Sequence, residues 1–236
     1  NTVQGYNNSM RINFRKNYDE FRQYFSIGST FGYGLSDKRF RGILYATYKF
    51  NDLNDQSISI SGGVTTQQFS NNAISPLVNL VSTLFFEDNY MKLYENTYAQ
   101  LNFSREVFNG LNMSSSLSYQ RRKPLFNTTE YVTINEDNDA YTSNNPLDET
   151  VFGIAPFSTH NLAKLNVTAR VRFNQKYFSY PDSKFSVPNG DYPTVFLSYE
   201  KGFAASNANY NYDQLQLRLT QRFNVANKGM LQYNLK

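Results

Sequence analysis

Polar and apolar residues alternate almost without interruption between Asn161 and Asn174. The apolar positions are Ala163, Leu165, Val167, Ala169, Val171 and Phe173. The polar positions between them are Lys164, Asn166, Thr168, Arg170, Arg172 and Asn174. Successive side chains of a β-strand point to opposite faces, so this pattern predicts a strand with one apolar and one polar face.

The same alternation recurs along most of the chain. Clear examples cover residues 10–15, 57–65, 111–120 and 215–222, and weaker ones lie near 22–33, 40–50, 94–106, 193–201 and 230–236. Together they predict about ten strands of about 9–12 residues, against a usual length of about 5–6. A strand that crosses a bilayer at a tilt needs about 9–11 residues, with apolar side chains toward lipid and polar ones toward the lumen. The pattern therefore predicts an all-β fold, an antiparallel transmembrane outer-membrane β-barrel.

A barrel gives each strand residue one of two environments. The basic residues predicted to face the lumen are Arg11, Arg15, Arg170, Arg172, Arg218 and Arg222. The residues predicted to face lipid are Leu165, Val167, Val171, Leu215, Leu217 and Leu219. We expect the lumenal bases to pair with acids such as Glu95, Glu106 and Glu200, because small barrels fill their interiors with side chains. An anion-favouring pore is the alternative.

The connections between the predicted strands differ strongly in length. Long ones at residues 68–92 and 121–159 follow even-numbered strands, as the long external loops of a barrel require. Within the first, Ser75 as N-cap and Pro76 in the first turn, with apolar residues at helical spacing, predict a short amphipathic helix near residues 76–86. The connection at residues 175–192 is also long, although it follows the seventh predicted strand and so lies on the predicted periplasmic side, where turns are short. Its pattern is typical of a small separate hairpin.

The polar stretch at residues 127–146 predicts a mobile external loop. Its acidic cluster, Glu136, Asp137 and Asp139, could collect calcium, although the spacing lacks the glycine and terminal glutamate of a known calcium loop.

Composition narrows the function classes. The chain has no cysteine, which excludes disulfides and thiolate chemistry, and one histidine, so we expect no metal or other cofactor. Mean hydropathy is −0.58, and no apolar run approaches the roughly 18 residues of a membrane helix. Aromatic residues make up 17% of the chain, all Tyr and Phe, as aromatic girdles at two membrane interfaces would require. The net charge is +4 with dispersed basic residues, a distribution that does not support nucleic-acid binding.

His160 is the weak candidate for catalysis, in the string Ala-Pro-Phe-Ser-Thr-His at residues 155–160. A serine nucleophile must lie within hydrogen-bond reach of the imidazole. Ser158 is two residues away, which in an extended chain corresponds to about 7 Å. Catalysis would therefore need a serine from a neighbouring strand. The other interpretation is a hydrogen-bonded histidine that fixes the corner between loop and strand.

Five strings, in order along the chain, carry a resemblance to a known family. They are NTVQG at residues 1–5, YGLSDKRF at 33–40, NYMKLY at 89–94, APFSTH at 155–160, and YP at 192–193 with SYEKG at 198–202. In this order they resemble a family of Bacteroidota outer-membrane proteins that join an N-terminal carboxypeptidase-regulatory-like β-sandwich to a large region of unknown function. The resemblance implies a barrel in the outer membrane and provides no reaction or catalytic residues to transfer.

Residues 1–236 are accordingly expected to form one β-barrel region, a fragment of a longer chain and part of a larger barrel. The final strand pattern is still running at Lys236. We expect a non-enzymatic scaffold or accessory subunit of an outer-membrane complex, in contact with outer-membrane lipid and with other outer-membrane or periplasmic proteins. The alternatives are a narrow solute channel with a basic lumen, an outer-membrane hydrolase using His160, and a soluble all-β binding domain.

Overall fold

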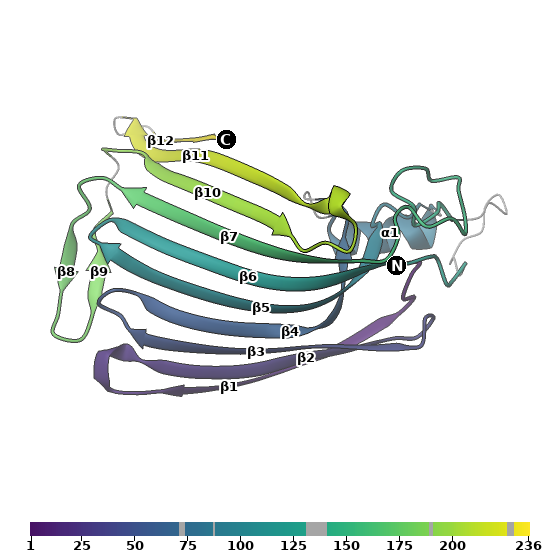
Figure 1. The fold of residues 1–236 in the computed structure, drawn as a ribbon, viewed down its shortest axis with the longest axis horizontal. Coiled ribbons are helices and arrows are strands. Elements are labelled where there is room, and N and C mark those ends of the chain that lie inside the picture. Colours follow the sequence, from purple (N-terminus) through teal and green to yellow (C-terminus); the bar gives the residue numbers. More distant parts are fainter. Residues whose placement is uncertain (71–73, 87, 131–140, 189–190, 226–228) are drawn as a thin grey trace.

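The computed structural model describes residues 1–70, 74–86, 88–130, 141–188, 191–225 and 229–236. In that part of the chain, ten strands form one antiparallel sheet (Figure 1). The strands are β1 (Asn7–Asn17), β2 (Tyr24–Gly34), β3 (Arg39–Asn51), β4 (Gln56–Gln68), β5 (Leu93–Phe108), β6 (Leu111–Pro124), β7 (His160–Arg172), β10 (Thr194–Phe203), β11 (Tyr212–Val225) and β12 (Gly229–Leu235). Each strand pairs with the one that precedes it in this order, which confirms the predicted all-β antiparallel fold.

The smaller elements lie at the ends of the sheet. The hairpin predicted between residues 175 and 192 is confirmed as β8 (Tyr177–Ser179) and β9 (Lys184–Ser186). Helix α1 (Pro76–Phe85) confirms the helix predicted near residues 76–86, with Pro76 in its first turn. Ser75 occupies the N-cap position, as predicted, but its side chain forms no capping hydrogen bond with the described residues. Two short 3₁₀ helices, η1 (Glu20–Arg22) and η2 (Ala208–Tyr210), lie in connections. In the described residues, no helix combines the length and apolar character needed to cross a membrane.

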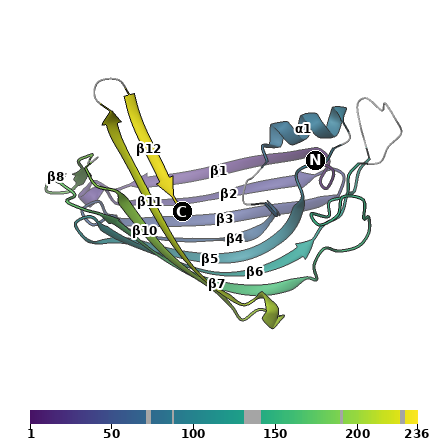
Figure 2. The same cartoon turned by 90° about the horizontal axis from the view of Figure 1, so that it is seen from above.

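The sheet curves into a trough (Figure 2). Helix α1 lies on the concave side at one end of the strands, and the β8–β9 hairpin lies at the other end (Figures 1 and 2). The edge strands β1 and β12 do not pair with each other in the described sheet, so the sheet is open. Closure into a barrel therefore stays a prediction.

Strand register sorts the side chains into rows that run across the sheet, because residues directly opposite on antiparallel strands share a face. One row is apolar and contains Ile60, Leu101, Leu117 and Leu165. The adjacent row is polar and contains Ser59, Asn102, Ser116, Asn166 and Glu200. Residues of α1 and of the polar face, including Gln100 and Ser118, line one cavity, so the polar face is the concave one.

The apolar core is small and lies at the α1 end of the sheet. Its cluster of buried residues consists of Val3, Met91, Leu93 and Leu125. In the described part of the chain, no second layer covers the apolar face of the sheet: Leu217 is 53% exposed and Ile60 58%. Several strands are longer than predicted, with 16 residues in β5 and 14 in β6. Leu93 and Tyr94 at the start of β5 are both buried, so alternation places the start of this strand only approximately, near residue 94.

Candidate functional site

One end of the trough is covered by segments that are distant in sequence. We call this assembly the cap, and define it as residues 1–5, 74–86, 88–92, 125–130 and 141–151. The N-terminal segment is part of it, because Thr128 donates from its backbone to the Thr2 carbonyl at 2.8 Å. Tyr141 donates its hydroxyl hydrogen to the Thr83 carbonyl in α1 at 2.6 Å. The cap therefore joins α1, the N-terminal segment and the long connection between β6 and β7.

Buried amide side chains replace sheet pairing in the cap. The Asn144 side chain accepts a hydrogen bond from Leu93 N at 2.8 Å and donates to the carbonyls of Leu93 and Leu125, each at 2.7 Å. Asn79 in α1 accepts from Met91 N at 2.7 Å. Buried backbone groups must find partners, and these asparagines provide them where the chain has no neighbouring strand.

This geometry corrects the prediction of a mobile loop at residues 127–146, as far as the described residues reach. Tyr141, Ser143, Asn144 and Asn145 are buried, so the second end of that segment is packed into the cap. Its polar side chains Ser143, Asn144 and Asn145 are internal hydrogen-bond partners. The acidic cluster Glu136, Asp137 and Asp139 lies outside the described residues.

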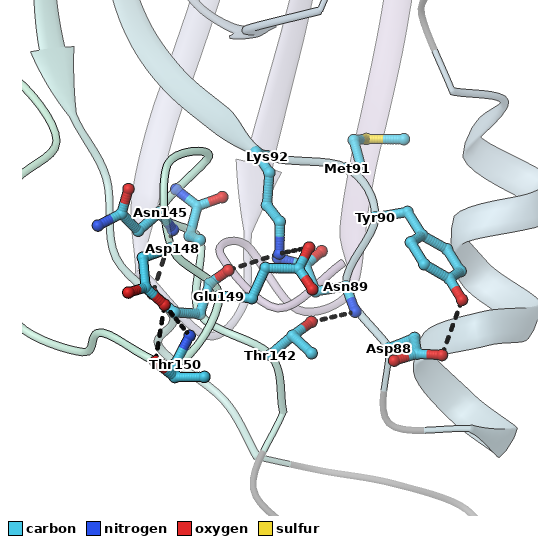
Figure 3. A network of polar contacts seen from close by, with 12 residues as sticks. Asp88, Asn89, Tyr90, Met91, Lys92, Thr142, Asn145, Asp148, Glu149 and Thr150 are labelled. Atoms are coloured by element: carbon cyan, nitrogen blue, oxygen red, sulfur yellow. Dashed lines mark hydrogen bonds and ion pairs between the residues drawn. The ribbon is translucent and has the colours of Figure 1, made fainter.

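A network of polar contacts fixes the outer part of the cap (Figure 3). Lys92 Nζ donates to the Ser143 carbonyl at 2.6 Å and forms an ion pair with Glu149 at 3.2 Å. Burial lowers the pKa of the Lys92 ammonium, against the opposing effect of Glu149. Asp148 accepts hydrogen bonds from Thr150 N and Oγ1, and they lower the pKa of its carboxyl group. Asp148 and Glu149 thus stabilise the connection between β6 and β7. The described residues contain no group of three or more acids or histidines suited to a metal ion.

A cavity of about 990 Å³ lies between α1 and the concave face. Amide side chains dominate its wall, and they include Gln67, Gln68, Asn79, Asn96, Gln100 and Gln120. The charged side chains of the wall are Arg122 and Lys164, and Lys164 forms an ion pair with Glu200 at 3.5 Å. This site could not be recognised in the sequence. Its amide side chains lie on the polar faces of several strands and on α1, and these elements come together only after folding.

His160 occupies the start of β7 and is 6% exposed. Its Nδ1 lies 2.9 Å from the backbone carbonyl of Ser158, not from the serine hydroxyl. The ring stacks on Tyr210 with 4.1 Å between centroids and meets the ring of Phe157 edge-on at 5.4 Å. These contacts hold the corner between the β6–β7 connection and β7. They agree with the interpretation of His160 as a hydrogen-bonded histidine that fixes this corner.

The six predicted lumenal arginines all belong to the main sheet, but the expected acid partners are wrong. Arg11 donates to Thr30, Arg15 to Asn17 and Arg222 to Gln232, while the Arg218 guanidinium lies 4.1 Å from the Phe196 ring centroid. Arg170 Nε and Arg172 Nε are buried and have no hydrogen-bond partner among the described residues.

The expected acids pair elsewhere. Glu95 binds Arg39 and Arg41, Glu106 binds Lys184, and Glu200 binds Lys164. Register explains the difference, because Arg170 and Arg218 lie opposite Phe196. Glu200 is four residues further along the same strand, about 13 Å away.

The six predicted lipid-facing residues lie on the convex face of β7 and β11. Strand β10 lies between these two strands, so register through β10 shows which residues share a face. Val167 lies opposite Tyr199, which lies opposite Leu215, and Val171 is connected in the same way through Val195 to Leu219. Leu165 lies in the apolar row of Ile60, and Leu217 lies opposite Leu197. The structure thus brings the predicted residues together on one face, whose environment remains a prediction.

A second site, which the sequence did not reveal, anchors the β8–β9 hairpin across the opposite end of the sheet. The Glu106 carboxylate accepts hydrogen bonds from the Tyr177 hydroxyl and from Gly110 N at 3.0 Å, and it forms an ion pair with Lys184 at 2.5 Å. Burial and the bond to Glu106 raise the pKa of the Tyr177 hydroxyl. The Arg22 guanidinium lies 4.8 Å from the Phe185 ring centroid, so the hairpin also reaches the connection between β1 and β2.

We expect Glu106→Gln to release this hairpin. The substitution leaves Lys184 without its counter-ion in a site where the two side chains are 14% and 7% exposed. Loss of one partner of a buried charged pair costs about 3 kcal/mol, so opening of the hairpin should increase roughly 100-fold. Limited proteolysis, with cleavage mapped to residues 177–186 by mass spectrometry, measures this opening.

Asp213→Asn is the matched control, because Asp213 and Lys201 form an ion pair in which both side chains are largely exposed. Such surface pairs contribute little. Equal cleavage of both variants at the hairpin would contradict the anchoring role of Glu106.

Comparison with known proteins produced one match. A family model described as "Family of unknown function (DUF5686) C-terminal domain" matches residues 1–236. No curated protein and no solved structure matches the chain.

Proposed function

Because the chain belongs to this family of unknown function, matching its C-terminal domain over residues 1–236, we propose a role from the geometry alone. The chain forms the wall of an outer-membrane β-barrel and acts as a non-enzymatic scaffold or accessory subunit of an outer-membrane complex. Its apolar convex face contacts lipid, its concave face lines the lumen, and strands beyond the described sheet complete the barrel. A Bacteroidota source and an N-terminal β-sandwich domain are parts of the same proposal.

The observation that carries the proposal is a continuous exposed apolar face. Along the rows of the sheet, Ile60, Leu101, Leu117, Leu215 and Leu217 are each between 44% and 71% exposed. Soluble monomers rarely expose contiguous apolar patches larger than a few hundred Å², since each Å² left in water costs roughly 25 cal/mol. A bilayer removes this cost without a second protein layer.

The scaffold role follows from where ordered contact surfaces lie. The cap and the β8–β9 hairpin occupy opposite ends of the strands, so a barrel in a bilayer presents one on each side of the membrane (Figure 1). Exposed Phe178 and Tyr180 on the hairpin offer aromatic contact area for a partner. His160 Nδ1 lies beside the Ser158 carbonyl and the ring stacks on Tyr210, contacts that support a structural role for this histidine.

Paired cysteine variants test the membrane orientation, because the chain has no cysteine of its own. Leu217 and Gln216 are neighbours in β11 and point to opposite faces. In lipid vesicles, Leu217→Cys should resist a hydrophilic maleimide and be quenched by a lipid-anchored quencher after labelling with a small fluorophore. Gln216→Cys should react with the maleimide and escape the quencher. The same contrast is expected for Leu101→Cys and Gln100→Cys in β5.

Heat-modifiable migration on detergent gels provides the accompanying check on the folded barrel. A protein that remains soluble without detergent would contradict the proposal. So would equal reactivity of the two cysteines in each pair with the hydrophilic maleimide.

A further inference from the structure

We propose that the cavity beneath α1 is a binding site for a neutral oligosaccharide. The cavity has a volume of about 990 Å³, at the upper end of the range for small-molecule sites. It is enclosed by α1 on one side and by the polar faces of β4, β5 and β6 on the other. The cavity shares Asn79, Leu80 and Met91 with the cap, but the proposal does not depend on the scaffold role or on closure of the sheet.

The first argument is an unsatisfied acceptor that points to a ligand. Asn96 is 3% exposed and belongs to the cavity wall. Its Nδ2 donates to Gln67 Oε1 at 3.3 Å, which fixes the amide orientation, and Tyr94 donates to the same oxygen at 2.8 Å. Among the described residues, none donates a hydrogen bond to Asn96 Oδ1. Asn96 Oδ1 itself has almost no accessible surface, so a sugar hydroxyl in the cavity would reach it after a small shift of the Asn96 side chain, and the hydrogen bond would then remove the cost of an unpaired acceptor.

The second argument is the chemistry of the wall. An amide side chain both donates and accepts hydrogen bonds, and so does each hydroxyl of a sugar. A wall that includes Gln67, Asn79, Asn96, Gln100 and Gln120 offers many such groups, and no carboxylate of the described residues lines it. This composition fits a ligand that is dense in hydroxyl groups and carries no net charge.

The third argument concerns the two charged side chains and the aromatic rings of the cavity wall. The Lys164 charge is compensated by Glu200 at 3.5 Å. Arg122 donates from Nε to Gln120, and its guanidinium lies 5.6 Å from the Tyr94 ring centroid. The wall is therefore not organised as an anion site. Tyr98 also lines the cavity and offers an aromatic ring against which the apolar C–H groups of a sugar ring can pack.

Isothermal titration calorimetry on the full chain tests the proposal. The protein is kept in a detergent without sugar groups, and the probes are maltohexaose, cellohexaose, mannohexaose and β-1,4-xylohexaose, with sodium phosphate as the anion probe. We expect saturable binding of at least one hexasaccharide. Asn96→Ala should weaken it about tenfold, because it removes one buried acceptor. Ser118→Trp should abolish binding, because Ser118 lines the cavity and the indole would fill it.

Each variant has a control on the same strand and the same face. Ser104→Ala lies in β5 and Ser114→Trp in β6, both outside this cavity, and both should bind as the unaltered chain does. Heat-modifiable migration or an unchanged circular dichroism spectrum verifies that each variant is folded. If Asn96→Ala does not fold, Ser118→Trp against Ser114→Trp decides the question.

Three results would overturn the proposal. They are no saturable binding of any hexasaccharide up to about 5 mM, binding of phosphate alone, or unchanged affinity in both cavity variants. The titration does not depend on a membrane, so its failure is distinct from failure of the cysteine test.

Discussion

Gly63→Ala is expected to prevent correct pairing of β3 with β4 and to remove the folded state. Gly63 has φ +146°, and a Cβ added there would lie 2.0 Å from the Gly42 carbonyl oxygen and 2.9 Å from Ile43 Cα. These are backbone atoms of the neighbouring strand, so no side-chain rotation can relieve the overlap. We expect a loss of more than about 4 kcal/mol in the free energy of unfolding, the range reserved for severe steric effects.

Two other glycines separate the sources of this effect. Gly153 has φ +75° and no atom within 4 Å of an added Cβ, so Gly153→Ala should cost only about 1 kcal/mol of backbone strain. Gly229 has open space and no positive φ, so Gly229→Ala should be neutral. Urea titrations followed by tryptic resistance measure the three midpoints. Equal midpoints for Gly63→Ala and Gly153→Ala would show that β3 and β4 tolerate the added carbon.

Asn144→Ala is expected to open the cap while the sheet stays intact. The substitution leaves three buried backbone groups without partners: Leu93 N, the Leu93 carbonyl and the Leu125 carbonyl. At about 1–3 kcal/mol for each unsatisfied group, partly offset by relaxation, the local cost is about 3–5 kcal/mol. Hydrogen exchange at Leu93 N should accelerate by more than about 100-fold, and proteolysis should begin in residues 141–151.

Asn211→Ala provides the comparison, because the Asn211 side chain accepts one exposed hydrogen bond, from Ala205 N. It should leave exchange at Leu93 unchanged. If Asn144→Ala also leaves it unchanged, other contacts hold the start of β5, and the cap does not depend on this asparagine.

The local elements could be predicted because their information is local. Alternation located the strands of the sheet, and helical spacing with Pro76 located α1. The turn residues between Tyr177 and Val187 indicated the β8–β9 hairpin. The exact start of β5, at Leu93, could not be read from the sequence, because Leu93 and Tyr94 are both buried and burial on both sides weakens the period of two.

The candidate sites could not be predicted in the same way, because their residues meet only after folding. Tyr177 and Glu106 are 71 residues apart, and Asn144 and Leu93 are 51 residues apart. The predicted pairing of acids with arginines failed for the same reason. Strand register decides which row across the sheet contains a given acid. Two residues that are four positions apart on one strand are separated by about 13 Å.

The sequence by itself determined an antiparallel all-β chain with one apolar and one polar face to each strand, because the backbone imposes a period of two on any strand. Only the tertiary structure decided that an amide-lined cavity lies between α1 and the concave face, that α1 and residues 141–151 cover one end of the sheet, and that Glu106 anchors the hairpin at the other. Those features depend on strand register and on contacts between distant segments, whose free energies are set by packing and hydrogen bonding in three dimensions.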